Sequence, residues 1–231
     1  MPRLTLPSES CCFRLDSDYG YRQQFPMTFN DVGLSDDGFE FNGESSYIRV
    51  PHQKSISFGI NDSFTVSCSF IFDGNTDKAL RLYRKGSNYY LFTTYTGEDV
   101  IFYTYDGTTT SGGRIDGIGD GHIHNVTVVV DRYNGKVLLY LDGIHDGTSW
   151  TLPDVGDTSS PYDLYIGSDG GDSLFFNGTI KHVSIYNRAL TAQEVADRYN
   201  QSTFLFLNNT PTPTQQAYLD WQNSRIIGRS R

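Results

Sequence analysis

Paired carboxylates on one strand would give the chain the acid and the nucleophile of a glycoside hydrolase. Such a pair needs alternate positions along the strand, so that both side chains face the sugar. The glutamates are instead scattered, at Glu9, Glu40, Glu44, Glu98 and Glu194. No serine lies in a Gly-X-Ser-X-Gly nucleophile elbow either. We therefore expect a protein that is not an enzyme, with a polysaccharide-active enzyme as the minor alternative.

Two histidines offer a second kind of chemistry. His122 and His124 alternate at the start of a predicted strand, and this spacing can bind zinc. A zinc site needs more ligands, so we interpret both as polar residues of an edge strand. The cysteines, Cys11, Cys12 and Cys68, are odd in number and two are adjacent. They do not predict a disulfide framework, and we interpret them as buried thiols.

An acidic, glycine-rich loop at residues 167–173 reads Gly-Ser-Asp-Gly-Gly-Asp-Ser. Calcium prefers hard oxygen ligands and accepts irregular geometry, so Asp169 and Asp172 are candidate calcium ligands. An ordinary acidic turn is the alternative interpretation. No other cofactor is expected.

Aromatic residues are the candidates for sugar binding, because a sugar ring stacks on tyrosine or tryptophan while polar neighbours bind its hydroxyls. Tyrosines are concentrated between residues 83 and 105, and a tryptophan follows at Trp150. Strand propensity and packing account for many of them. From this group we name Tyr103, Tyr105 and Trp150 as candidate carbohydrate-binding residues.

A β-hairpin between His122 and Gly143 is the clearest element that could position such residues. Two β-branched and aliphatic runs flank Asn134 and Gly135, a dipeptide that tolerates positive φ at both centres of a type I′ turn. Both faces of both strands are largely apolar. Strands that are apolar on two sides are covered on two sides, so we expect this hairpin in the middle of a sheet in a two-layer β fold.

Alternating apolar residues predict further strands. These are expected at residues 11–15, 39–41, 47–50, 63–72, 79–85, 89–94, 100–105, 162–166 and 175–186. The strand at 63–72 alternates strictly and should be half-buried. Residues 107–121 and 150–161 are expected to be loops.

The residue composition and the predicted structure change toward the end of the chain. Thr191-Ala-Gln-Glu resembles a capping box, in which Thr191 and Glu194 bind each other's backbone amides. It predicts a short helix to about Asn200, and residues 203–207 are a predicted final strand. The Thr- and Pro-rich residues that follow form an extended linker. We divide the chain into a domain of residues 1–208 and a C-terminal arm of residues 209–231.

The arm contains apolar residues that could dock on a partner. They are Tyr218, Leu219, Trp221 and Ile226. The arm either folds back on its own domain or docks on a neighbouring chain, as the arms of subunits in large particles do.

Size and charge exclude several classes of partner. A chain of 231 residues and 26.0 kDa suits one β domain with appendages. The net charge of −9 argues against nucleic acid or an anionic membrane. No run approaches the roughly 20 apolar residues of a membrane span, and the N-terminus lacks the apolar core of a signal peptide. We expect no nucleic-acid partner, no membrane insertion, and an intracellular or virion-associated protein.

Three segments together resemble laminin-G-like domains of the concanavalin A-like lectin and glucanase superfamily. They are the hairpin with its Leu-Tyr-Leu-Asp-Gly ending, the upstream pieces from Phe39 to Phe70, and the stretch from Leu164 to Tyr199. The resemblance implies an all-β jelly-roll sandwich of two antiparallel sheets, in which residues 11–15 pair beside the closing strand. It also implies a recognition module for a glycan or a protein.

Pentraxins, which are similar in fold, bind calcium through an acidic loop in this place and an Asp-Asn pair from an earlier hairpin. Asp169 and Asp172 match the loop. The earlier pair would fall at Ser87 and Asn88, where Asn88 matches but a serine replaces the aspartate. The resemblance thus implies a calcium site of Asn88, Asp169 and Asp172 that lacks one charged ligand.

Two main functions follow. The first is a non-catalytic, lectin-like module that binds a glycan or a protein surface. The second is a structural subunit of a large assembly, such as a virion or phage particle, whose C-terminal arm docks on neighbouring subunits.

Overall fold

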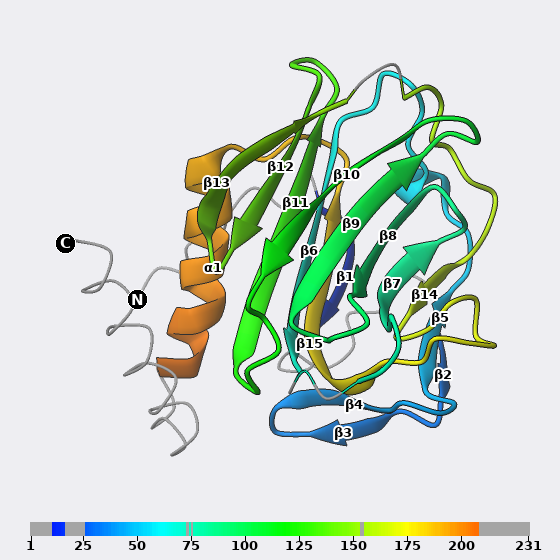
Figure 1. Cartoon of the computed structure of the whole chain (residues 1–231), viewed down its shortest axis with the longest axis vertical. Coiled ribbons are helices and arrows are strands. Elements are labelled where there is room, and N and C mark those ends of the chain that lie inside the picture. The colour runs from blue at the N-terminus through cyan, green and yellow to red at the C-terminus, as the bar shows by residue number, and fades with distance from the viewer. Residues whose placement is uncertain (1–10, 17–25, 73, 75, 153–154, 208–231) are drawn as a thin grey trace.

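The computed structural model describes residues 11–16, 26–72, 74, 76–152 and 155–207. Within them, the strands form two antiparallel sheets that face each other across a common core (Figure 1). This confirms the predicted all-β sandwich. The helices in these residues are a short 3₁₀ helix, η2 (Lys54–Ile56), and one α-helix, α1 (Ala192–Leu207).

The eight-stranded sheet contains the predicted hairpin. Its strands are β1 (Cys11–Asp16), β3 (Gly33–Ser35), β4 (Gly38–Asn42), β6 (Phe64–Ile71), β11 (Ile123–Asp131), β12 (Lys136–Leu141), β13 (Ile144–Thr151) and β15 (Asn177–Tyr186). The order is β13-β12-β11-β6-β15-β4-β3, and β1 also pairs with β15. The leading strand therefore pairs beside the closing strand, as predicted.

The seven-stranded sheet lies on the other side of the core. Its strands are β2 (Thr28–Asn30), β5 (Tyr47–Val50), β7 (Arg81–Lys85), β8 (Tyr89–Thr93), β9 (Asp99–Tyr105), β10 (Thr110–Asp116) and β14 (Leu164–Ile166). The order is β10-β9-β8-β7-β14-β5-β2. Figure 1 shows α1 beside β12 and β13 of the eight-stranded sheet, so the outer face of the seven-stranded sheet has no helix over it in the part of the chain described.

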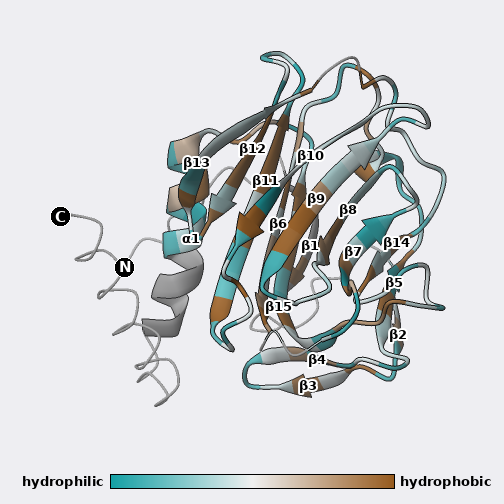
Figure 2. Cartoon of the chain, in the orientation of Figure 1, coloured by the Kyte–Doolittle hydropathy of each residue, from teal (hydrophilic) through white to brown (hydrophobic). Residues whose placement is uncertain are grey.

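The hairpin of β11 and β12 lies inside its sheet, with β6 on one side and β13 on the other, as predicted. One face of β11, which includes Val128, belongs to the main core between the sheets. The opposite face, which includes Val129, packs with Tyr140 and with Val195 of α1. Figure 2 shows apolar residues along β9, β11 and β12. The two apolar faces are thus covered by the second sheet and by α1.

The turn of this hairpin differs from the prediction. β11 ends at Asp131 and β12 begins at Lys136, and of the four residues between them only Gly135 has a positive φ, 62°. The Asp131 carboxylate accepts a hydrogen bond from the backbone nitrogen of Asn134 at 3.1 Å, which favours the longer loop. The two-residue turn with positive φ at both centres lies instead at residues 142 and 143, between β12 and β13.

Two segments that were expected to be loops contain strands. β10 lies within residues 107–121, and β13 extends to Thr151, so Trp150 belongs to a strand. The Ser-Gly-Gly sequence in β10 has low strand propensity, but its pairing with β9 supplies the hydrogen bonds. The side chain of Ser111 also donates a hydrogen bond to the carbonyl oxygen of Thr151 at 2.7 Å, which joins the edges of the two sheets. Tertiary pairing here overrides local propensity.

Strand β6 is buried on both faces rather than half-buried. Phe64, Val66 and Phe70 enter the main core, as predicted. Thr65, on the opposite face, is also fully buried. The segment before α1 covers it, because the Thr65 hydroxyl donates to the Arg188 carbonyl oxygen at 2.9 Å.

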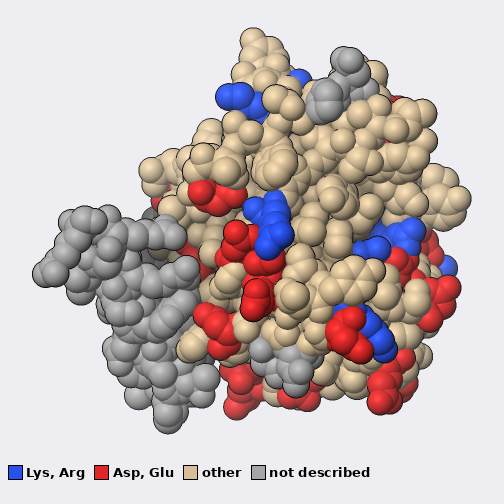
Figure 3. Space-filling model, in the orientation of Figure 1, with Lys and Arg blue, Asp and Glu red and all other residues tan. Residues whose placement is uncertain are grey.

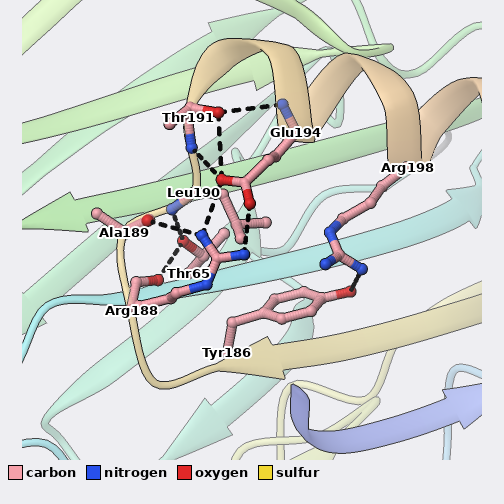
Figure 4. A network of polar contacts seen from close by, with 8 residues as sticks. All are labelled: Thr65, Tyr186, Arg188, Ala189, Leu190, Thr191, Glu194 and Arg198. Atoms are coloured by element: carbon pink, nitrogen blue, oxygen red, sulfur yellow. Dashed lines mark hydrogen bonds and ion pairs between the residues drawn. The ribbon is translucent and has the colours of Figure 1, made fainter. Parts of the chain in front are cut away.

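A network of polar contacts fixes the start of α1 on this sheet (Figure 4). The Thr191 amide donates to Glu194 Oε2 at 2.9 Å, and the Glu194 amide donates to Thr191 Oγ1 at 3.2 Å, which confirms the capping box. Arg188 pairs with the same carboxylate through both terminal nitrogens, at 2.8 and 2.5 Å. The Leu190 amide donates to Thr65 Oγ1 at 3.1 Å. Sheet, connecting segment and helix are therefore bound together.

The predicted strand at residues 203–207 is wrong, because these residues continue α1. Once a helix has a capped first turn, each further residue adds a hydrogen bond with little further ordering of the chain. Further along the helix, Arg198 lies 4.5 Å above the Tyr186 ring, so α1 stays on the sheet beyond its first turn.

Candidate functional site

The outer face of the seven-stranded sheet carries six aromatic side chains. Side chains alternate along a strand, and the residues between these six, such as Ile48, Leu91 and Phe102, are fully buried in the core. All six are half-buried. We call this surface the aromatic face, and it comprises Tyr47, Tyr90, Phe92, Tyr103, Tyr105 and Tyr165.

Three of these rings form a cluster at the centre of the sheet. Tyr90 and Tyr103 are cross-strand partners, with ring centroids 5.9 Å apart. Phe92 lies 5.7 Å from each of them. The rings are tilted or edge-on to one another, the arrangement that aromatic quadrupoles prefer. The cluster is therefore a preformed apolar platform on a sheet face that no described helix covers.

A glycine in β10 leaves the space that the Tyr103 ring occupies. Gly112 lies directly opposite Tyr103, and a Cβ atom at this position would come within 2.5 Å of the Tyr103 ring and 1.9 Å of the Phe102 carbonyl oxygen. Any side chain at Gly112 would displace both strands.

Arg81 lies over the aromatic cluster. Its guanidinium carbon is 5.0 Å from the Tyr90 ring centre and 4.7 Å from that of Phe92, within the range of cation–π contacts. Its Nε lies 3.1 Å from Asp169 Oδ2. Burial lowers the pKa of Arg81 from its usual value. The Asp169 carboxylate therefore balances a partly buried charge that lies against the rings of Tyr90 and Phe92.

Arg84, the next outward arginine of β7, pairs across the sheet with Tyr90 and Tyr165. Its Nη1 forms an ion pair with Asp169, and its Nε donates to the Gly86 carbonyl oxygen at 2.6 Å. Burial and the nearby charge of Arg81 lower the pKa of Arg84.

The arginines of this sheet are paired with carboxylates. Arg81 and Arg84 share Asp169, and Arg49 Nε lies 2.6 Å from Asp163 Oδ2. In Figure 3, most of the basic groups on the face toward the viewer lie beside acidic ones, and uncharged residues cover most of the area. The aromatic face is thus polar in places but balanced in charge.

Two carboxylates do come together at the edge of this sheet, but an arginine joins them. Asp99 and Asp116 are cross-strand partners of β9 and β10. Arg114 pairs with Asp99 through Nη2 and with Asp116 through Nε, the latter at 2.7 Å. Burial raises the pKa of Asp99 although Arg114 opposes this. Both acids are engaged by the guanidinium between them, so this pair is poorly suited to act as a glycosidase acid and nucleophile.

The candidate calcium ligands have other partners. Asp169 is paired with two arginines, and Asp172 Oδ1 accepts a hydrogen bond from the Ser173 hydroxyl at 3.1 Å. The Asn88 side-chain nitrogen lies 3.4 Å from the Tyr105 carbonyl oxygen. Among the residues that the structure describes, no group of three or more His, Cys, Asp or Glu side chains is arranged to hold a metal ion. The donor set therefore does not fit a calcium ion in this arrangement.

His124 is buried rather than part of an edge strand, so our interpretation of it was wrong. It lies on β11, inside the sheet. Its ring is buried because the loop before β11 and the β12–β13 turn cover it. Its Nδ1 is 3.0 Å from Asp142 Oδ2 and its Nε2 is 3.1 Å from Asp120 Oδ1. Burial by itself would lower the pKa of His124, but hydrogen bonds and charges from Asp142 and Asp120 outweigh it and raise the pKa. His124 thus ties the β12–β13 turn to β11.

The structure brings together two of the three predicted sugar-binding residues. Tyr103 and Tyr105 both lie on the aromatic face. Trp150 does not, because its ring packs against Gly113, on the opposite side of β10 from Gly112. The predicted arm residues Tyr218, Leu219, Trp221 and Ile226 lie outside the described residues.

The other members of the aromatic face were not among the predicted sugar-binding residues. Tyr90 and Phe92, like Tyr103 and Tyr105, are two residues apart, and this spacing places each pair on one side of its strand. That signal was available in the sequence. The contribution of Tyr165 was not, because it depends on the pairing of β14 with β7.

A laminin G family model, described as the concanavalin A-like lectin/glucanases superfamily, matches residues 42–196. The chain belongs to this superfamily. The match includes the hairpin, the aromatic face and the start of α1, so the lectin-like fold expected from the resemblance is confirmed. No curated protein matches the chain in sequence.

Solved structures with this lectin-like fold include binding domains of bacterial toxins. The binding domain of Paraclostridial Mosquitocidal Protein 1 has a TM-score of 0.69 and 15% identity, over 84% of this chain and 52% of that one. The botulinum neurotoxin serotype G binding domain has a TM-score of 0.67 and 17% identity, over 82% and 50%. This chain therefore spans about half the length of these structures. The likeness establishes the fold alone.

Helix α1 belongs to the sandwich, and none of the described helices has the length and apolar character required to cross a membrane.

Proposed function

We propose that this chain is a non-catalytic recognition module that binds a neutral glycan on the aromatic face. The proposal rests on the cluster of Tyr90, Phe92 and Tyr103, which is exposed in part on a sheet that no described helix covers. An apolar sugar face stacks on such rings, and this gives affinity without requiring charge.

The paired arginines favour a neutral ligand. Each guanidinium of this face already has a carboxylate partner, so little net positive charge is available to attract an anionic glycan. Arginine and aspartate side by side supply donors and acceptors, and both are needed to bind sugar hydroxyls. Binding should therefore change little with salt concentration, because screening weakens only interactions between net charges.

The solved structures with the same fold support a binding role. Both are binding domains of toxins. Asp99 and Asp116, the cross-strand carboxylate pair at the edge of this sheet, are both held by Arg114, which supports recognition rather than hydrolysis.

The test is a titration of the protein with neutral oligosaccharides selected from an immobilised glycan panel. Tyr103→Ala and Tyr90→Ala should each weaken binding by about fivefold or more, since loss of one stacked ring is worth about 1 kcal/mol or more. Tyr133→Ala is the matched control, because Tyr133 is 92% exposed on the β11–β12 loop of the other sheet. Circular dichroism checks that each variant is folded.

Unchanged affinity in Tyr103→Ala, or binding that vanishes at high salt, would contradict the assignment. If no neutral glycan binds while an isolated protein ligand does, the glycan assignment is wrong and the face recognises protein.

The role as a subunit of a large particle stays a prediction, since residues 209–231 lie outside the described residues. Particle assembly with and without residues 209–231 is the direct measurement. Unimpaired assembly of the truncated chain would contradict docking through the arm.

A further inference from the structure

In pentraxins, which this chain resembles in fold, calcium is bound by an acidic loop and an Asp-Asn pair from an earlier hairpin. In this chain the corresponding segments are residues 167–173 and the β7–β8 turn at residues 86–88. Both segments are present, and the contacts between them show what joins them here.

Arg84 forms the connection between the two segments. On one side its Nη1 pairs with Asp169 of the acidic loop. On the other side its Nε donates to the Gly86 carbonyl oxygen at 2.6 Å, and its Nη2 lies 3.5 Å from Ser87 Oγ. A carboxylate, a backbone carbonyl and a hydroxyl oxygen are the kinds of ligand that a calcium ion takes, and here they surround a guanidinium.

The charge of Asp169 in the acidic loop is also balanced. Arg81 Nε contacts the second carboxylate oxygen of Asp169 at 3.1 Å, so both oxygens face arginine nitrogens. A divalent ion at this position would have to displace Arg84 and would lie close to the positive charge of Arg81. Like charges at such short range repel each other, so the arrangement disfavours a metal ion beside Arg81.

We propose that Arg84 is a built-in cation that replaces a metal ion at this site, both in holding the acidic loop to the β7–β8 turn and in contacting the ligand. A guanidinium has five N–H donors, and the contacts above use three of them. The Arg84 side chain is 28% exposed and lies between Tyr90 and Tyr165 in the sheet. Its remaining donors are therefore within reach of oxygen atoms of a ligand on the aromatic face, and this second role rests on the proposed function.

The first experiment needs no glycan. Isothermal titration of the wild-type protein with calcium chloride should give no saturable heat, and EDTA should leave its melting temperature unchanged. Saturable calcium binding that Asp169→Asn abolishes would overturn the proposal.

The second experiment separates Arg84 from other surface arginines. Arg84→Ala and Arg84→Lys should both lower the melting temperature. Alanine removes all three contacts, and a lysine ammonium lacks the planar fork of donors that lets arginine bind all three partners at once. Arg49→Ala is the control, since Arg49 pairs with Asp163 on the same sheet but joins no loop to a turn. A melting temperature for Arg84→Ala equal to that of Arg49→Ala would overturn the structural role.

Ligand contact is tested with the neutral oligosaccharide that binds the wild type. Arg84→Ala should bind at least about tenfold more weakly, the effect of losing a charged hydrogen bond, and wild-type binding should be the same in calcium and in EDTA. If no glycan binds, the proposed function fails while the calcium titration still tests Arg84. If a glycan binds only with calcium, the inference about Arg84 fails while the proposed function holds.

Discussion

Replacement of Glu194 by glutamine tests how α1 is held on the sandwich. The change keeps the size of the side chain and removes its charge. It weakens two contacts with Arg188, at 2.8 and 2.5 Å, and the capping bond from the Thr191 amide at 2.9 Å. The second capping bond, which the Glu194 backbone amide donates to Thr191 Oγ1, should survive because it does not involve the carboxylate.

The expected loss of stability follows from the pKa of this carboxyl group. The hydrogen bonds from Arg188, and then those from the Thr191 backbone, lower the pKa of Glu194 from 4.5 to about 2. A shift of this size corresponds to about 3 kcal/mol at full strength. The Glu194 side chain is 35% exposed, so water screens the interaction and we expect a loss of about 1–2 kcal/mol at pH 7. For a domain of this size, that lowers the melting temperature by about 3–6 °C.

The pH dependence gives the sharper test. The folded-state pKa of Glu194 is depressed, so its contribution is complete above pH 4.5 and is lost as the pH falls toward about 2. The free energy of unfolding, measured in urea, should therefore differ between wild type and Glu194→Gln at both pH values. By a rough two-state estimate, the difference at pH 3 should be less than half of that at pH 7. Gln193→Ala, a neighbour in the first turn of α1, is the control. An equal difference at both pH values would refute this account of the network.

Three further variants test other parts of the structure by chemical unfolding. Gly112→Ala should lose about 2–3 kcal/mol, because its Cβ would lie 1.9 Å from a backbone oxygen of β9, and wild-type stability would contradict that close approach. Burial lowers the pKa of Lys85 to about 8, so the charged form of its side chain destabilises the folded state below that pH. Lys85→Met should therefore be more stable than wild type by about 1 kcal/mol at pH 7, and this difference should vanish near pH 10.5. The pKa of His124 is raised by Asp142 and Asp120, so its stabilisation is complete below pH 6.5 and falls as the pH rises through the folded-state pKa. His124→Asn should therefore lose more stability at pH 6, on the order of 3 kcal/mol, than at pH 9, and an equal loss would count against the ion pairs.

The fold was largely predictable because its main signals are local. The alternation of Phe64, Val66 and Phe70 identifies a strand and its inner face, since successive side chains point to opposite sides. The capping box at Thr191 and Glu194 locates the start of α1 for a similar reason, because both partners lie within one turn.

The wrong predictions concern residues whose structure depends on contacts between distant segments of the chain. β10 has little strand propensity around Gly112, and only its neighbour β9 makes it a strand. His124 looked like an edge residue because its partners, Asp120 and Asp142, meet only when two loops close over it. Trp150 looked like a loop residue because β13 depends on the tight turn after β12.

By itself, the sequence determined which residues point into the core, since this depends on a repeat of two residues along each strand. It also determined which tyrosines were available for a binding surface. Only the tertiary structure decided which of them lie together, because cross-strand register brings Tyr90 beside Tyr103 and leaves Trp150 on the other side of β10. Likewise, Arg84 and Asp169 meet only through the packing of the loop after β14 against β7, a contact between distant segments that no local pattern specifies.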